Sequence, residues 1–148
     1  MGMSKGGGLD TEQVYKKALE LIERSQESYF ATIDGQGRPA IRGMMIWRRE
    51  GLKKVWYAGF SYSRKMVNLG ENPAAGVYMW GRDGQKIAAL ALTGSARVLR
   101  DQAARHEFWE SSLLEYYTGP DDPDYCIIEF TASECDFHQD NRSYVFAP

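Results

Sequence analysis

"VWYAGFSYSRKMVNLGENPAAGVYMW", residues 55–80, changes its hydrophobic pattern twice within one stretch. Its two ends have the β-branched and aromatic content of strands. Between them, Ser63 can cap a short helix over residues 64–69, which Gly70 and Pro73 bring to an end. The stretch therefore predicts strand, helix and strand in succession, with the helix connecting two strands.

The strand pattern continues on both sides of this stretch. Short apolar segments alternate with turn residues, and Gly94 lies in the middle of one long segment, where it predicts the bulge or bend that a closing barrel needs. Strands are expected over residues 28–34, 38–50, 53–60, 74–80 and 86–100, with one or two more within 125–138. Hairpin-linked strands at this spacing indicate a small antiparallel barrel.

Two longer helices are expected beside the barrel. Residues 10–27 have apolar positions at helical spacing, with Asp10 as the N-cap, and residues 101–119 form a second helix. Residues 1–9 are small and predict a flexible N-terminus. With no long linker and no internal repeat, residues 1–148 are expected to form one domain.

Composition excludes several classes of function. The 148 residues are 43% hydrophobic and 26% charged, with a formal net charge of −2, which argues against a general nucleic-acid binder. No apolar run approaches the roughly 20 residues of a membrane span, and a cytoplasmic protein is expected. The cysteines and histidines follow neither a disulfide nor a metal-ligand spacing, so no metal site is predicted: Cys126, Cys135, His106 and His138.

Residues 60–69 place a hydroxyl and two cations at the start of the expected short helix, at Ser63, Arg64 and Lys65. The first turn of a helix has free N–H groups and a partial positive charge, which favour a phosphate. Arginine can bind two phosphate oxygens and lysine adds a mobile charge. Helix stability alone would favour an acidic residue here. An anion site and an ordinary helix start with solvated charges both remain open.

The strand over residues 38–50 contains a second unusual group. Arg42 has apolar neighbours, Gly43 leaves the backbone bare, and Met44 and Met45 are pliable apolar side chains. Such a strand can bind a flat ligand through its main chain. The alternative is a strand with methionines as core filler and an arginine in solvent.

Three stretches together resemble the pyridoxamine 5'-phosphate oxidase-like split barrels that bind FMN, and especially their general stress protein 26-like branch. The resemblance covers about residues 28–101 in order and spacing. It is carried by "FATIDGQGRPAIRGM" (30–44), "VWYAGFSYSRKMVNLGENPAAGVYMW" (55–80) and "ALALTGSARVLRD" (89–101). The implied fold is mainly β with flanking α-helices, a six-stranded antiparallel split β-barrel.

The resemblance also implies a cofactor, FMN, and the residues that bind it. The family holds the FMN phosphate with its Ser-Arg-Lys turn, which here is Ser63, Arg64 and Lys65. The flavin ring is implied to lie along two strands, between Arg42, Gly43, Met44 and Met45 on one side and Tyr57, Ala58 and Gly59 on the other. A homodimer is implied as well, with FMN at the subunit interface.

The chain departs from true pyridoxamine 5'-phosphate oxidases at several places. Trp47 stands where they carry a lysine, Ala89 or a neighbour where they carry a glutamine, and two of their later signatures are missing. Oxidation of pyridoxamine 5'-phosphate is therefore not expected. Three functions remain open: a flavin-dependent oxidoreductase with a small-molecule substrate or NAD(P)H as partner, a non-catalytic FMN storage or sensing protein, and a binder of deazaflavin or haem. No catalytic residue is identified, since Tyr57 and Tyr62 fit barrel packing as well as substrate contact.

Overall fold

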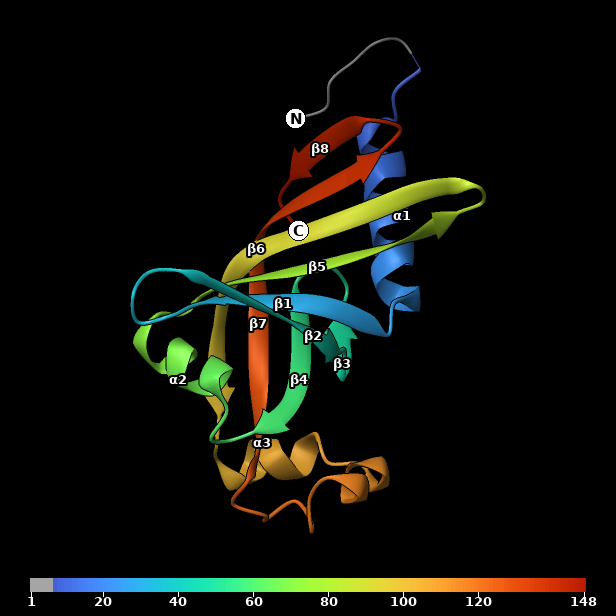
Figure 1. Ribbon diagram of the computed structural model, residues 1–148. Coiled ribbons are helices and arrows are strands. Elements are labelled where there is room, and N and C mark those ends of the chain that lie inside the picture. Colours follow the sequence, from blue (N-terminus) through green and yellow to red (C-terminus); the bar gives the residue numbers. More distant parts are fainter. Residues whose placement is uncertain (1–6) are drawn as a thin grey trace.

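One antiparallel sheet curls around the core in the computed structural model, which describes residues 7–148 (Figure 1). Its strands run in the order β2-β1-β5-β6-β7-β4-β3, and β8 pairs with β7 outside this path. Their bounds are β1 (Glu27–Ile33), β2 (Pro39–Met45), β3 (Arg48–Glu50), β4 (Lys54–Phe60), β5 (Ala74–Asp83), β6 (Lys86–Leu99), β7 (Tyr125–Gln139) and β8 (Arg142–Phe146).

The expected fold class, an antiparallel split barrel with flanking helices, is confirmed, but with eight strands in place of six. The additional strands arise in two ways. The segment expected as one strand over residues 38–50 divides after Met45 into β2 and the short β3, because β2 pairs with β1 whereas β3 pairs with β4. The positive φ angles of Asp140 and Asn141 make a tight turn that returns the chain as β8.

Gly94 allows β6 and β7 to pack closely along most of their length. The register of this pair shifts between Thr93 and Gly94, as expected for a bulge. A Cβ atom on Gly94 would lie 1.9 Å from the carbonyl oxygen of Thr131, so only glycine fits at this position. The bend lets two long strands serve both halves of the barrel.

Four helical segments flank the sheet: α1 (Thr11–Arg24), α2 (Arg64–Glu71), α3 (Gln102–Glu107) and the 3-10 helix η1 (Ser111–Glu115). At the start of α1, Asp10 and Gln13 form a reciprocal capping box. Helix α2 runs two residues beyond the expected end at Leu69 and includes Gly70.

The single helix expected over residues 101–119 is wrong. The helix ends at Glu107, and the chain turns before η1. Phe108 is buried, and its carbonyl accepts a hydrogen bond of 2.7 Å from the indole nitrogen of Trp47. Tertiary packing of Phe108 therefore takes precedence over the local helical pattern.

Two apolar clusters form the interior. The larger fills the barrel and packs the buried face of α1 against the sheet, and the smaller lies between the β4–β7 pair and the α3–η1 segment. In Figure 1, α3 lies at the end of the barrel away from α1. No helix within residues 7–148 is long and apolar enough to span a membrane. The prediction of a flexible N-terminus over residues 1–9 falls mostly outside the described residues, and the amide of Leu9 donates to the Tyr144 hydroxyl.

Candidate functional site

A hollow of about 710 Å³ opens where the start of α2 faces the β1–β2 hairpin. Four of its lining residues were predicted, from the family resemblance, to be phosphate or flavin contacts, and the fold brings these together from two elements: Arg42, Ser63, Arg64 and Lys65. The other lining residues come from the hairpin: Asp34, Arg38, Pro39, Ala40 and Ile41. We call this hollow the anion hollow, because of the charges described next.

The first turn of α2 offers unpaired donors to the anion hollow. Ser63 occupies the N-cap position, but its hydroxyl donates to the Phe60 carbonyl at 2.8 Å and makes no capping bond. The amides of Met66 and Val67 both donate to the Ser63 carbonyl. Within residues 7–148, no acceptor is recorded for the amides of Arg64 and Lys65. The helix start therefore presents two free N–H groups together with two basic side chains.

Arg42 enters the same hollow from β2. Its Nη1 atom donates three bonds, to the carbonyls of Phe30 and Ala40 and to the hydroxyl of Thr32 at 2.9 Å. The Nε and Nη2 groups make no hydrogen bond among the described residues. Arg42 is thus held along one edge of its guanidinium, while the other donors stay available to a ligand.

The three cations at the anion hollow repel one another. Partial burial and then the charge of Arg64 lower the pKa of Arg42 below its ordinary value. Burial followed by the charge of Arg42 likewise lowers the pKa of Lys65. Within the described chain neither Arg64 nor Lys65 forms an ion pair with a carboxylate. Such an uncompensated cluster is what a phosphate dianion would neutralise.

Two charged residues of the anion hollow, Asp34 and Arg38, were missed by the sequence reasoning, which placed them only at the facing ends of two expected strands. The Asp34 carboxylate accepts from the amides of Gln36 and Arg38 and forms an ion pair with the Arg38 side chain at 3.1 Å. These contacts, with the backbone bond from Arg38 foremost, hold the pKa of Asp34 below its ordinary value. Because Arg38 neutralises this carboxylate locally, the hollow as a whole remains cationic.

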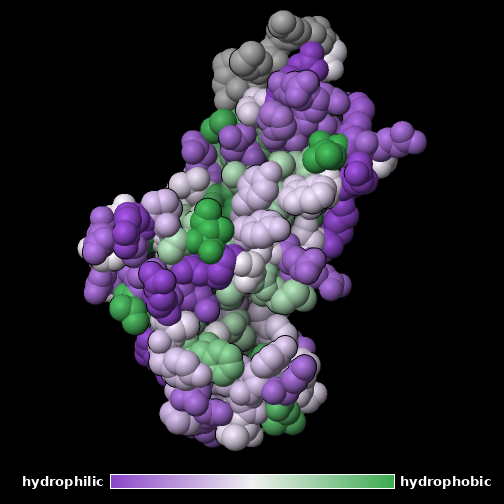
Figure 2. All heavy atoms as spheres, in the orientation of Figure 1, coloured by the Kyte–Doolittle hydropathy of each residue, from purple (hydrophilic) through white to green (hydrophobic). Residues whose placement is uncertain are grey.

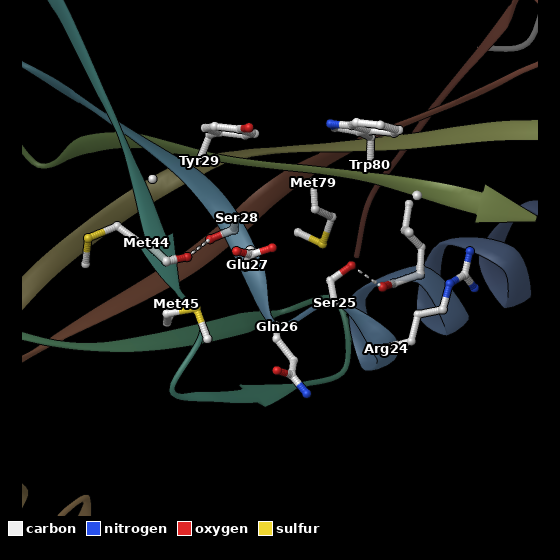
Figure 3. A pocket seen from close by; sticks show the side chains of 13 residues that line it. Arg24, Ser25, Gln26, Glu27, Ser28, Tyr29, Met44, Met45, Met79 and Trp80 are labelled. Carbon is white, nitrogen blue, oxygen red and sulfur yellow. Dashed lines mark hydrogen bonds between the residues drawn. The ribbon is translucent and has the colours of Figure 1, made fainter. Parts of the chain in front are cut away.

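The other predicted residues of β2 line a second hollow, of about 660 Å³ (Figure 3). Gly43, Met44 and Met45 form one side of it, and Figure 3 shows Tyr29 and Trp80 above them. The Ser28 hydroxyl donates to the Met44 carbonyl at 3.1 Å, marked by a dashed line in the figure. The remaining lining residues are Leu21, Arg24, Ser25, Gln26, Glu27, Met79 and Gly81. Arg42 and Gly43 are adjacent, so β2 contributes to both hollows.

The three predicted residues of β4 lie deeper than those of β2. Tyr57 is fully buried, its ring centroid 5.1 Å from that of Phe30 and its hydroxyl 2.6 Å from the Ser28 hydroxyl. Burial raises the pKa of Tyr57 well above its ordinary value. Gly59 is buried beside Met66, whereas Ala58 packs against the smaller apolar cluster. Tyr57 and Gly59 thus face the barrel interior, and a flavin contact for the β4 residues stays a prediction.

An exposed apolar face adjoins both hollows. Cross-strand partners project to the same side of a sheet, and Tyr29 pairs with Gly43 on β2 and with Tyr78 on β5. The register therefore places on one outer face six large apolar side chains that are 42–69% exposed: Tyr29, Ile41, Met45, Tyr78, Trp80 and Ile87. In Figure 2, pale and green spheres gather over the middle of the molecule, between purple regions over α1 and α2. We call this set the aromatic face.

Comparison with known proteins identifies the class to which this fold and site belong. Residues 13–147 match the family described as "Pyridoxamine 5'-phosphate oxidase like", and the chain belongs to this family. The family expected from the sequence is thereby confirmed.

Individual relatives support the general stress protein 26-like branch. A solved structure from Clostridium acetobutylicum, of a protein related to general stress protein 26 of Bacillus subtilis, is 30% identical with a TM-score of 0.82, covering 93% of this chain and 96% of that one. General stress protein 26 of Bacillus subtilis (strain 168) is 21% identical over 122 residues, 82% of this chain and 85% of that protein. A heme binding protein from Mycobacterium smegmatis shares the fold, with a TM-score of 0.73 and 15% identity, covering 90% of this chain and 57% of that chain.

Proposed function

We propose that the chain is an FMN-binding flavoprotein whose anion hollow holds the FMN phosphate. The observation that carries this proposal is the uncompensated cluster of Arg42, Arg64 and Lys65 at a helix start with free amides. The cluster fits the phosphate of FMN in charge and in donors. Ser63 lines the same hollow, and its hydroxyl would donate to a phosphate oxygen only by exchanging its present bond to the Phe60 carbonyl.

The flavin ring would continue from the anion hollow along β2. Gly43 offers open backbone there, since nothing lies within 4 Å of the position of a Cβ atom. Met44 and Met45 supply adaptable apolar contacts beside the ring, and Arg42 can stabilise negative charge close to it. FMN, when bound, supplies the hydride and electron transfer, and the protein supplies orientation and hydrogen bonds.

The substrate is proposed to differ from pyridoxamine 5'-phosphate. Trp47, which replaces the lysine of true oxidases, donates its indole N–H to the Phe108 carbonyl and is part of the smaller apolar cluster. It therefore anchors the α3–η1 segment and lines neither hollow. The proposed activity is that of a flavin-dependent oxidoreductase for another small molecule. A non-catalytic FMN carrier uses the same contacts.

A homodimer through the aromatic face is part of the proposal. Six exposed apolar side chains on one sheet face are typical of a surface that a partner covers. The face includes Met45, Tyr29 and Trp80, which also line the second hollow. A second copy of the chain seated there would enclose a flavin lying along β2.

Haem has less support than FMN in this chain. Neither histidine lines the two hollows: His106 pairs with Asp121 at 2.7 Å, and His138 lies 3.1 Å from the Ser143 hydroxyl. A histidine ligand from this chain would therefore require a different site. The visible spectrum of the purified protein distinguishes the two cofactors.

Charge removal tests the phosphate contact directly. Arg64→Ala and Lys65→Ala each remove a charge-assisted bond of about 1.5–3 kcal/mol, so each should weaken FMN binding at least about tenfold. Riboflavin, which lacks the phosphate, should bind with nearly unchanged affinity. Titrations of both ligands by flavin fluorescence measure the difference. An FMN affinity that survives the double substitution contradicts the proposal.

Anaerobic addition of NAD(P)H to the FMN-loaded protein then separates the two forms of the proposal. Loss of the flavin absorbance indicates an oxidoreductase. A flavin whose absorbance does not change with NADH or with NADPH indicates a carrier.

A further inference from the structure

Two buried polar side chains meet behind the anion hollow. Thr32 on β1 is fully buried and Asn68 on α2 is 6% exposed. The Thr32 hydroxyl oxygen accepts from Arg42 Nη1 and from Asn68 Nδ2, each at 2.9 Å. One oxygen atom therefore joins three elements: β1, β2 and α2.

This arrangement is unusual in an otherwise apolar barrel. Burying a hydroxyl or an amide costs about 1–3 kcal/mol unless it is hydrogen-bonded, and valine or leucine would fill the same space without that cost. Apart from tyrosines and cysteines, four buried polar side chains are found within residues 7–148: Ser28, Thr32, Asn68 and Gln139. Two of the four, Thr32 and Asn68, meet at this one point, which we call the junction.

The junction controls both sources of charge at the anion hollow. On the β2 side, Thr32 provides the one side-chain acceptor among the three that hold Nη1 of Arg42, the other two being the carbonyls of Phe30 and Ala40. Together they orient the guanidinium plane and leave Nε and Nη2 for a ligand. On the α2 side, Asn68 lies three and four residues after Lys65 and Arg64, hence on the same face of the helix one turn later. Anchoring Asn68 therefore anchors the helix start that carries both cations.

The repulsion between the cations gives a physical reason for the hydrogen bonds that link α2 to β1 and β2 at the junction. Burial lowers the pKa of Arg42 and of Lys65; the charge of Arg64 adds to this effect at Arg42, and the charge of Arg42 adds to it at Lys65. The cations on the two sides of the hollow therefore repel one another. Without a ligand, this repulsion favours moving α2 away from β2. The neutral hydroxyl of Thr32 opposes that movement without neutralising any charge.

We infer that Thr32 and Asn68 are positioning residues for the phosphate group, and that they hold Arg42 and the start of α2 in binding geometry before the ligand arrives. This inference rests on the proposed function. Neither side chain lines the hollow itself, so both act through residues that do. Their loss should cost affinity for the phosphate and leave affinity for the rest of the flavin unchanged.

The test compares FMN with riboflavin in Thr32 variants. Thr32→Val keeps the shape and removes the acceptor, and it should reduce the FMN-to-riboflavin affinity ratio about tenfold. Thr32→Ser keeps the hydroxyl and should restore most of the ratio. Asn68→Leu should reduce the ratio less, since the Arg42 bond remains. Gln139→Leu removes another buried amide, which donates to Asp83, and should leave the ratio unchanged.

The outcomes separate the two levels of argument. Thermal melts followed by circular dichroism establish that each variant is folded. A wild-type ratio in folded Thr32→Val, or an equal loss of both ligands, overturns the positioning role alone. A wild-type chain that binds FMN no more tightly than riboflavin overturns the proposed function and this inference with it. If Thr32→Val does not fold, the ratios of Thr32→Ser and Asn68→Leu decide: wild-type values in both overturn the inference, and a reduced ratio in Asn68→Leu supports it.

Discussion

Lys65 carries the one charge of the anion hollow that can be removed by raising the pH. Burial and Arg42 place its pKa below the ordinary value of 10.5 in the ligand-free protein, and a bound phosphate would raise it again. The complex therefore binds more protons than the free protein, so FMN affinity should fall as the pH rises through the lowered pKa toward 10.5. The expected loss is up to about tenfold, measured as the FMN-to-riboflavin ratio.

Lys65→Arg is the matched control for this pH dependence. Its guanidinium stays protonated throughout the range, so the affinity ratio should be flat there. A wild-type ratio that is also flat would show that Lys65 does not contact the phosphate.

At the scale of single residues, the sequence predicted the cations of the anion hollow better than their supports. Ser63, Arg64 and Lys65 are adjacent in the chain, and a helix start could be expected from local rules alone. Asp34, Thr32 and Asn68 could not be assigned in the same way. Their roles depend on the β1–β2 register and on where α2 docks, which are tertiary facts.

The pairing of β6 with β7 depends on one glycine. Gly94→Ala would place a methyl group 1.9 Å from the Thr131 carbonyl oxygen, and backbone cannot yield as a flexible side chain can. We expect the free energy of unfolding to fall by about 3 kcal/mol, the upper end of typical overpacking costs. Urea denaturation followed by circular dichroism measures it.

Gly70→Ala makes the same chemical change inside α2. No atom lies within 4 Å of the added Cβ, and the position is exposed. Alanine is the better helix former, so this variant should gain about 0.5–1 kcal/mol. Equal effects at the two glycines would contradict the close strand approach seen at Gly94.

At the scale of elements, the predictions succeeded where one local signal was sufficient. Gly94 indicated the bulge, and Ser63 indicated the start of α2. They failed over residues 101–119, where Phe108 and Trp109 fit a helical pattern but pack beneath the chain as it turns. They also missed β8, since its only indication was the turn at Asp140 and Asn141.

The aromatic face makes a prediction about the whole molecule. Trp80→Glu places a carboxylate in the proposed interface. In the dimer this charge would be buried without an opposite charge beside it. The dimer should dissociate to monomers in analytical ultracentrifugation, and FMN affinity should fall with it. Leu114→Glu, a similar change at a residue that is 59% exposed on η1, should leave the dimer intact. A monomeric wild-type protein would contradict the dimer but not the anion hollow.

Strand β7 links the two halves of the barrel, and this affects how the chain folds during synthesis. It pairs with β6 along most of its length, with β4 at its beginning and with β8 at its end. Lys54 of β4 pairs with Thr131, which is synthesised much later, because a ribosome adds about 5–20 residues per second. For several seconds the nascent chain therefore carries an open strand edge beside unburied aromatic side chains. In the cell, chaperone demand and aggregation of this protein should depend on how quickly translation reaches β7.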